Sequence, residues 1–180
     1  MCRAEETILA ERAIVESLQA KVLEAIERTE HLVSLAPADR LAWKPEMPAS
    51  VAPVNDLAHT LGHLLDCLAG FCAVFRAAFP ERLADFEKLR DLPVNRAGSV
   101  EEVSAGMRVF AGHIARGFDC CADSDLARRI PTLFVPAGET LLTLLLGNLE
   151  HLNNHKYQLF LYLKLAGVAV SSRDVYQFRG

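Results

Sequence analysis

Two pairs of histidines in this sequence are each separated by one helical turn. His151 and His155 lie in "EHLNNHKYQLFLYLKLAG", and His59 and His63 lie in "LAHTLGHLLDCLAGF". Residues i and i+4 share one face of an α-helix, so each pair can bring two imidazoles near one point in space. Imidazole nitrogens are common ligands of zinc and related divalent ions. The spacing therefore indicates metal binding, although each histidine can instead be a core residue whose ring nitrogens are satisfied by hydrogen bonds.

The pair on the last segment falls on the apolar side of that segment. At about 100° per residue, His151 and His155 share a face with Leu159. Glu150 and Lys164 lie roughly opposite, so both imidazoles are expected to point inward. No carboxylate stands between the two histidines, so the general base of an HExxH metalloprotease is missing. Three polar residues of the inward side are expected to hold the remaining ring nitrogens: Asn148, Gln158 and Tyr162.

On the earlier segment only one of the two histidines borders the apolar face. The apolar arc that begins at Leu57 extends around the helix as far as His63. His59 sits beside Asp66 at the polar margin. We therefore expect His63 to be the metal ligand from this segment and keep His59 as the alternative. Two such pairs on two helices of one small protein are less easily explained by chance than one pair, so a shared metal site and hydrogen-bonded core histidines are both open interpretations here.

The elements that must position these residues are four long amphipathic segments. Helices are expected over residues 5–34, 56–79, 99–120 and 139–166. Asn55 or Asp56 can cap the second helix. Ser99 and Glu102 have the spacing of a capping box for the third helix, and Gly167 suits the end of the fourth. Such helices are about 30 to 42 Å long at 1.5 Å per residue, so the sequence predicts an all-α four-helix bundle.

The connections between these helices are expected to be long. Four prolines interrupt "APADRLAWKPEMPASVAPVND" and exclude a helix there. Residues 81–97 are expected to form a short helical piece and a loop. The stretch "DSDLARRIPTLFVPAGE" is expected to form an extended loop or a hairpin fragment. With no internal repeat, one helical domain over residues 1–180 is predicted.

Composition narrows the possible partners and location. The chain is 51% hydrophobic and 23% charged, with a net charge of −4 and scattered Lys and Arg, which argues against nucleic-acid binding. Small-molecule partners are expected instead. The N-terminus lacks the apolar core of a signal peptide, and apolar runs such as "TLLTLLLGNLEHLNNH" are interrupted too early to span a membrane. Five cysteines without a CxxC spacing predict neither a disulfide framework nor a zinc ribbon, and hence a cytoplasmic protein.

Other residues received simpler interpretations. His31 is expected at the surface near the end of the first helix. His113 on the third helix could reach the bundle interior but is not expected to belong to the site. Cys120 and Cys121 are expected to be inert, and Trp43 to anchor the loop after the first helix. The apolar surface of the second helix is wider than the stripe of about 100° that a helix needs to face one core. A second copy of the chain could cover the excess, so a homodimer is predicted. The remaining side of this helix carries three alanines: Ala69, Ala73 and Ala77.

Three stretches of the chain together resemble the DinB/YfiT-like superfamily. They are Trp43-Lys-Pro after the first helix, "GHLLDCL" on the second and "HLNNHKYQLFLYLKLAGVAV" on the last. The resemblance implies a four-helix bundle with a three-histidine metal site, whose ligands fall on His63, His151 and His155. His59 departs from the pattern as an additional imidazole one turn earlier. Residues 81–135 match no signature of the superfamily and are expected to shape the pocket and its substrate.

The resemblance also suggests an activity. Three histidines leave open coordination positions on zinc, nickel or a similar divalent ion, which can activate water or a thiol. Some members of the superfamily are thiol-dependent transferases or isomerases. The resemblance therefore implies a metal-dependent S-transferase that uses a low-molecular-weight thiol on a small electrophile. Two alternatives remain: a non-catalytic metal-binding or stress-response protein, and a metal-free helical dimer that keeps only the fold.

Overall fold

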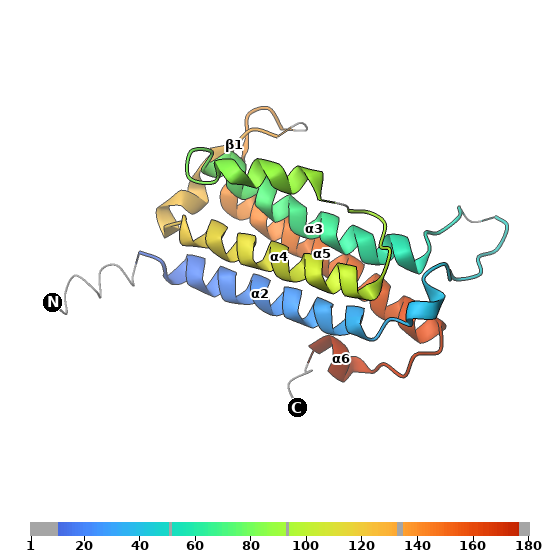
Figure 1. Ribbon diagram of the computed structural model, residues 1–180. Helices are drawn as coiled ribbons and strands as arrows, with labels where there is room; N and C mark the ends of the chain where they lie inside the picture. The colour runs from blue at the N-terminus through green and yellow to red at the C-terminus, as the bar shows by residue number, and fades with distance from the viewer. Residues whose placement is uncertain (1–10, 51, 93, 133–134, 177–180) are drawn as a thin grey trace.

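The computed structural model of the protein describes residues 11–50, 52–92, 94–132 and 135–176 (Figure 1). The expected start of the first helix at residue 5 lies outside the described residues. Four long helices dominate the rest: α2 (Ala13–Ser34), α3 (Leu57–Ala78), α4 (Val100–Asp119) and α5 (Leu141–Leu165). Shorter elements connect or follow them: the 3₁₀ segments η1 (Ala38–Arg40), η2 (Ala84–Asp91) and η3 (Asp123–Ala127), the strands β1 (Arg129–Ile130) and β2 (Glu139–Thr140), and α6 (Ser172–Tyr176).

Side-chain caps set where three of the long helices begin. Asp56 accepts a hydrogen bond from the backbone of His59 at the start of α3, as expected for an N-cap. Ser99 caps α4 by accepting from the Glu102 backbone, while the Glu102 carboxylate accepts from the backbone of Gly98, not of Ser99. The predicted start of the last helix at residue 139 is wrong by two residues. Residues 139–140 pair with β1 as an antiparallel strand, so α5 begins after Thr140.

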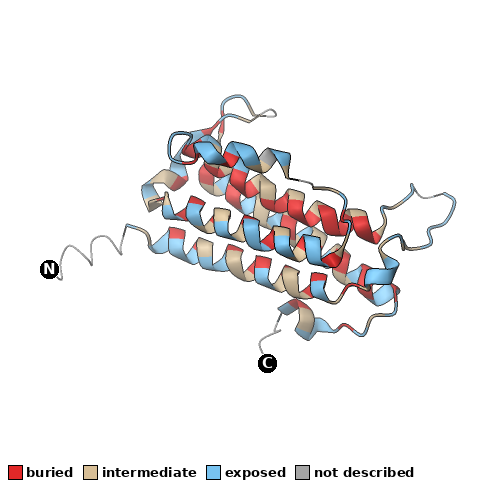
Figure 2. Ribbon diagram, in the orientation of Figure 1, coloured by how far each residue is buried: buried red, intermediate tan, exposed pale blue. Residues whose placement is uncertain are grey.

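The four long helices pack side by side as a bundle. α3 packs against both α4 and α5, and α2 packs against the same two helices from the other side. Figure 2 shows that buried residues cover most of α3, whereas α2 and α4 each keep an exposed face. The largest fully buried side chains include Phe71 and Phe75 on α3 and Met107, Phe110, Ile114 and Phe118 on α4. The predicted all-α four-helix bundle with long connections is confirmed.

α3 is long and apolar enough to cross a membrane by length and composition. The sequence argument about interrupted apolar runs overlooked this helix. More than half of its most apolar stretch is buried inside the bundle, as expected of the core helix of a soluble protein. Because α4, α5 and η2 all pack against it, we interpret its apolar character as the result of packing on several sides.

The short helix α6 was not predicted, and it gives His31 a partner. The His31 side chain is half-buried, and its Nε2 lies 3.0 Å from Asp174 Oδ1 on α6. This hydrogen bond, together with bonds from Ser171, lowers the pKa of Asp174 to about 2. His31 lies in the last turn of α2, as expected, and its partly exposed side chain also links α2 to the C-terminal segment. Five residues are too few to show a helical periodicity in the sequence.

Candidate metal centre

The bundle brings His63, His151 and His155 together between α3 and α5. Their ring centroids are 5.2 Å apart for His63 and His151 and 4.8 Å apart for His151 and His155. The Nε2 atoms of His63 and His155 are only 3.1 Å apart. Cys67 belongs to the same cluster, and the four donor atoms, one from each residue, all lie within 4.8 Å of one another. The cluster therefore joins residues that are far apart in sequence.

The other ring nitrogens of His63 and His155 have partners of their own. Nδ1 of His63 lies 2.7 Å from Asn95 Oδ1, and Nδ1 of His155 lies 2.8 Å from Gln158 Oε1. An amide oxygen only accepts hydrogen bonds, so both Nδ1 atoms must donate. A neutral imidazole carries one proton, which leaves each Nε2 as an unprotonated lone pair. The two lone pairs face each other across the cluster.

Two facing lone pairs repel each other, and either a proton shared between the nitrogens or a metal ion bound to both removes this repulsion. Two nitrogens bound to zinc at 2.0–2.1 Å in tetrahedral geometry are about 3.3 Å apart, close to the observed separation of the two Nε2 atoms. Burial lowers the pKa of His155, and the charges of the neighbouring histidines lower it further, against the opposing effect of the Gln158 hydrogen bond. The residues present therefore fit a divalent metal ion.

The polar residues expected around the site occupy different places. Gln158 bonds to His155 directly, and its amide nitrogen donates to the Tyr162 hydroxyl at 3.4 Å. Tyr162 in turn donates to the backbone oxygen of Asn55, and its ring meets Trp43 edge to face. Trp43 thus packs the connection between α2 and α3 against α5. It lies beside the chain of hydrogen bonds that ends at His155. The Asn148 amide lies against Gly70 instead, in contact with α3.

Sequence reasoning missed Asn95, which lies in the connection between η2 and α4. Its backbone has a φ of 65°, in the left-handed region that asparagine tolerates better than most residues. The Ala97 backbone donates to Ala58 of α3, and a Cβ at Gly62 would overlap the backbone of Arg96. The segment 94–97 can therefore lie directly on α3 because residue 62 has no side chain. This close approach places the Asn95 amide beside His63.

Sequence reasoning also missed Cys67, although its spacing from His63 was visible. The two residues are one turn apart on α3, and the Cys67 thiol is buried. Burial raises the pKa of this thiol to about 12, and the charge of Asp66 acts in the same direction. The Asp66 carboxylate also lies 3.5 Å from Nδ1 of His63. An i, i+4 pair of histidine and cysteine on an apolar face is the signal that identifies this donor.

The other histidines and cysteines that the structure describes lie outside the cluster. The His59 ring stacks on His63 with centroids 6.1 Å apart, but His59 is not among the four clustered residues. The His113 ring packs against Phe86 of η2. Cys121 is buried, and burial raises its pKa to about 12, which agrees with an inert thiol.

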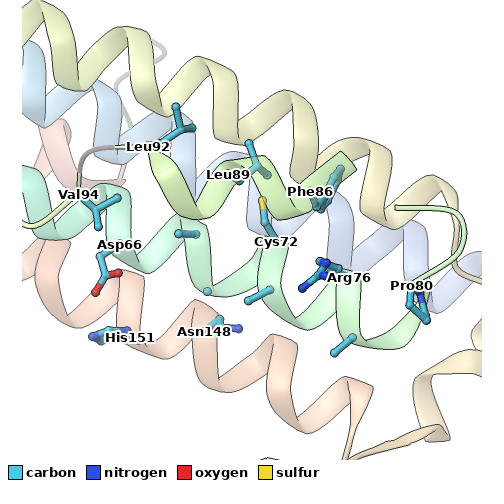
Figure 3. Close-up of a pocket in the computed structure, with 14 residues that line it drawn as sticks. Asp66, Cys72, Arg76, Pro80, Phe86, Leu89, Leu92, Val94, Asn148 and His151 are labelled. Atoms are coloured by element: carbon cyan, nitrogen blue, oxygen red, sulfur yellow. The ribbon is translucent and has the colours of Figure 1, made fainter. Parts of the chain in front are cut away.

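A cleft of about 810 Å³ opens beside the cluster, between α3, α5 and the segment that follows α3. Figure 3 shows Asp66 and His151 facing each other at one end of it, and Arg76 and Pro80 toward the other. Asn148 lies between these ends, and hydrophobic side chains of the segment after α3 form the opposite wall: Phe86, Leu89, Leu92 and Val94. His151 belongs to both the cluster and the cleft, so a molecule at this end of the cleft would contact the histidine cluster.

Comparisons with known proteins agree with this architecture. The DinB-like protein YjoA from Bacillus subtilis has a solved structure that aligns with a TM-score of 0.62 at 16% sequence identity. The alignment covers 84% of this chain and 92% of that chain, and at this identity it shows a shared fold. A search of curated proteins finds no match. A profile described as DinB superfamily matches residues 22–159, a range that includes His63, His151 and His155. The resemblance noted in the sequence is thereby confirmed, and the chain belongs to the DinB superfamily.

Proposed function

We propose that His63, His151 and His155 hold a divalent metal ion, zinc or nickel, and that the protein uses it as a thiol-dependent S-transferase on small electrophiles. The observation that carries the metal is the pair of Nε2 atoms 3.1 Å apart, each on a ring whose Nδ1 meets an amide oxygen. Membership of a metal-associated superfamily supports the same conclusion.

The side chains of this site would have separate tasks. Asn95 and Gln158 orient two imidazoles and favour the tautomer that carries its proton on Nδ1, so that the Nε2 lone pairs of the neutral rings point to the ion. A bound ion would supply Lewis acidity and stabilise the thiolate form of a small thiol. The cleft has the size of a small-molecule site, and its apolar wall would hold the body of a substrate and exclude water. Arg76 and Asn148 offer polar contacts along it.

A second candidate function has one specific observation in its favour. The buried thiol of Cys67 lies in the same cluster as the three histidines. Zinc sites with four protein ligands are usually structural, whereas catalytic sites keep one position open. A non-catalytic metal-binding or stress-response protein is therefore the alternative. Turnover of a thiol and an electrophile distinguishes the two functions.

The direct test is metal analysis of the full chain purified without an affinity tag, followed by a thiol-conjugation assay with a panel of small thiols and electrophiles. We expect one divalent ion per chain. The variant His155→Ala should lose stoichiometric metal and keep its helix content, because the bundle has a large core away from the site. His113→Ala, at a histidine outside the cluster, is the matched control. A full complement of metal in His155→Ala would refute the site.

We also propose that the protein is a cytoplasmic homodimer. The argument from the alanines of α3 needs revision, because Ala69, Ala73 and Ala77 line the cleft. Support for the dimer comes instead from leucines of α5 whose side chains are about half exposed: Leu146, Leu161 and Leu165. Light scattering at micromolar concentration should give twice the mass of the chain, and a monomer would contradict the proposal.

A further inference from the structure

We propose that Cys67 supplies a fourth donor to the ion held by His63, His151 and His155. The inference rests on the metal site proposed above and not on the S-transferase activity. It changes the expected resting state of the centre, because three nitrogens and one sulfur complete a tetrahedral zinc site without an open position.

The position of Cys67 on α3 is what permits this coordination. Cys67 follows His63 by four residues, so both side chains leave the helix on the same face. Its sulfur and the three imidazole nitrogens lie within 4.8 Å of one another. In a tetrahedral zinc site with Zn–S near 2.3 Å and Zn–N of 2.0–2.1 Å, sulfur and nitrogen are about 3.6 Å apart. The 4.8 Å limit of the cluster is about 1.2 Å larger than this separation.

Burial shields the sulfur from solvent and favours the protonated thiol, so a bound metal ion is what would stabilise the thiolate. Cys67 is 1% exposed, so only a group already inside the bundle can reach it. On coordination the thiol proton leaves to solvent and the sulfur binds as thiolate, which reduces the net charge of the buried centre from +2 to +1. A soft thiolate favours zinc over harder divalent ions. A small-molecule thiol must therefore displace Cys67 or add as a fifth ligand before it can react.

Cys72 provides a matched control on the same helix. It is 2% exposed, and burial raises its pKa to about 12, as for Cys67. Cys72 is not part of the histidine cluster and lines the cleft instead. The two thiols therefore share the same kind of environment and differ in their distance from the proposed ion.

The experiment is a titration of the full-length protein with cobalt(II), recorded by absorption spectroscopy. The wild type should bind one cobalt per chain and show a thiolate-to-cobalt charge-transfer band in the near ultraviolet. Cys67→Ser should lose this band and still bind one cobalt at higher cobalt concentration, whereas Cys72→Ser should keep the wild-type spectrum. Circular dichroism of both variants verifies that they fold.

A second measurement needs no variant. X-ray absorption of the zinc-loaded wild type should show one sulfur at about 2.3 Å together with nitrogen neighbours at about 2.0 Å. A centre that binds one ion with nitrogen and oxygen neighbours alone, or a charge-transfer band that persists in Cys67→Ser, overturns the role of Cys67 and leaves the three-histidine site intact. A wild type that binds neither cobalt nor zinc overturns the metal site itself, and this inference with it.

Discussion

α3 faces two partners in the bundle, and the two contacts differ in chemistry. Toward α4 it forms an apolar seam, in which Phe75 meets Phe118 edge to face with ring centroids 4.9 Å apart. Toward α5 it forms a polar seam, in which His63 meets His155. Glycines allow close approach in both seams: Gly117 leaves room for the Phe75 ring, and Gly70 leaves room for the Asn148 amide.

The difference shows how one helix can serve folding and chemistry at once. The apolar seam removes aromatic and aliphatic surface from water, which stabilises the bundle without any ion. The polar seam keeps imidazoles, an amide and a thiol close to a cleft, where they contribute less hydrophobic burial. Stability and metal binding should therefore respond to different substitutions. The four predictions that follow test this separation, in order of decreasing effect.

The largest effect is expected from Phe75→Ala in the apolar seam. Phe75 is fully buried, and its removal leaves a cavity beside Phe118, so the free energy of unfolding should fall by about 3–5 kcal/mol. Guanidinium denaturation of the metal-free protein measures this change. Metal stoichiometry of the folded variant should equal that of the wild type. A folded variant that binds no metal would show that the two seams are not independent.

Asn95→Gly should weaken metal binding and leave the stability of the protein nearly unchanged. Glycine tolerates the positive φ of this position, so the backbone can stay in place while the acceptor for His63 is lost. Metal affinity should fall about 10–100-fold, with little change in the free energy of unfolding of the metal-free protein. Competition with a chromophoric chelator measures the affinity. Asn95→Asp keeps an acceptor oxygen and serves as the control; equal affinity in Asn95→Gly and the wild type would exclude this role for Asn95.

Gly117→Ala tests how tightly the apolar seam is packed. A Cβ at this position would collide with the Phe75 ring, so overpacking should outweigh the gain in helix propensity and cost about 1–3 kcal/mol. Gly112→Ala on the same helix meets no neighbouring atom and should stabilise by about 0.5–1 kcal/mol. Thermal unfolding of the pair is the measurement. A stabilised Gly117→Ala would mean that the ring moves aside at little cost.

The smallest effect concerns Lys156, on the side of α5 that faces α2. Its side chain is 4% exposed, and its ammonium bonds to Asn153 Oδ1 at 2.9 Å. Burial lowers the pKa of Lys156, and Arg28 and Lys21 lower it further. Lys156→Met should therefore stabilise the protein by about 1 kcal/mol at neutral pH.

The pH dependence of this effect has a definite sign. The folded protein has the lower pKa, so between the folded and unfolded pKa values the unfolded chain binds more protons. The stability of the wild type should rise relative to Lys156→Met as pH increases toward the ordinary lysine pKa near 10.4. Urea denaturation across this range measures the difference. If the stability difference between the wild type and Lys156→Met does not change with pH, the contacts of the Lys156 ammonium offset the cost of its burial.

The helices and two of the relationships around the site could be predicted from local patterns. Periodicity located the long helices, and the apolar arc of the second one favoured His63 over His59, which the structure leaves outside the cluster. The proximity of Gln158 to His155 also follows from helical spacing, because the two residues are three apart on one helix. These relationships lie within single elements, where the sequence spacing determines the geometry.

The features that the sequence did not reveal depend on contacts between distant segments of the chain. Asn95 lies 32 residues from His63, in a connection without periodicity, so only the folded chain shows that the two meet. The contact between His31 and α6 joins residues 143 positions apart. Cys67 is a different case, because its spacing from His63 was visible but the sequence argument considered cysteines only for disulfides, CxxC sites and redox chemistry, and not as partners of histidines.

The close approach at Gly62 has a consequence for the order of events during folding. The backbone of Arg96 can rest against residue 62 only on the bare surface of a helix already formed. Closing the chain between these positions loses entropy, and few contacts compensate for that loss until α3 and α4 have docked. We expect Asn95 to reach His63 late on the folding pathway. In refolding experiments, tight metal capture should therefore follow the recovery of helix signal, so the ion would report the completion of folding and not initiate it.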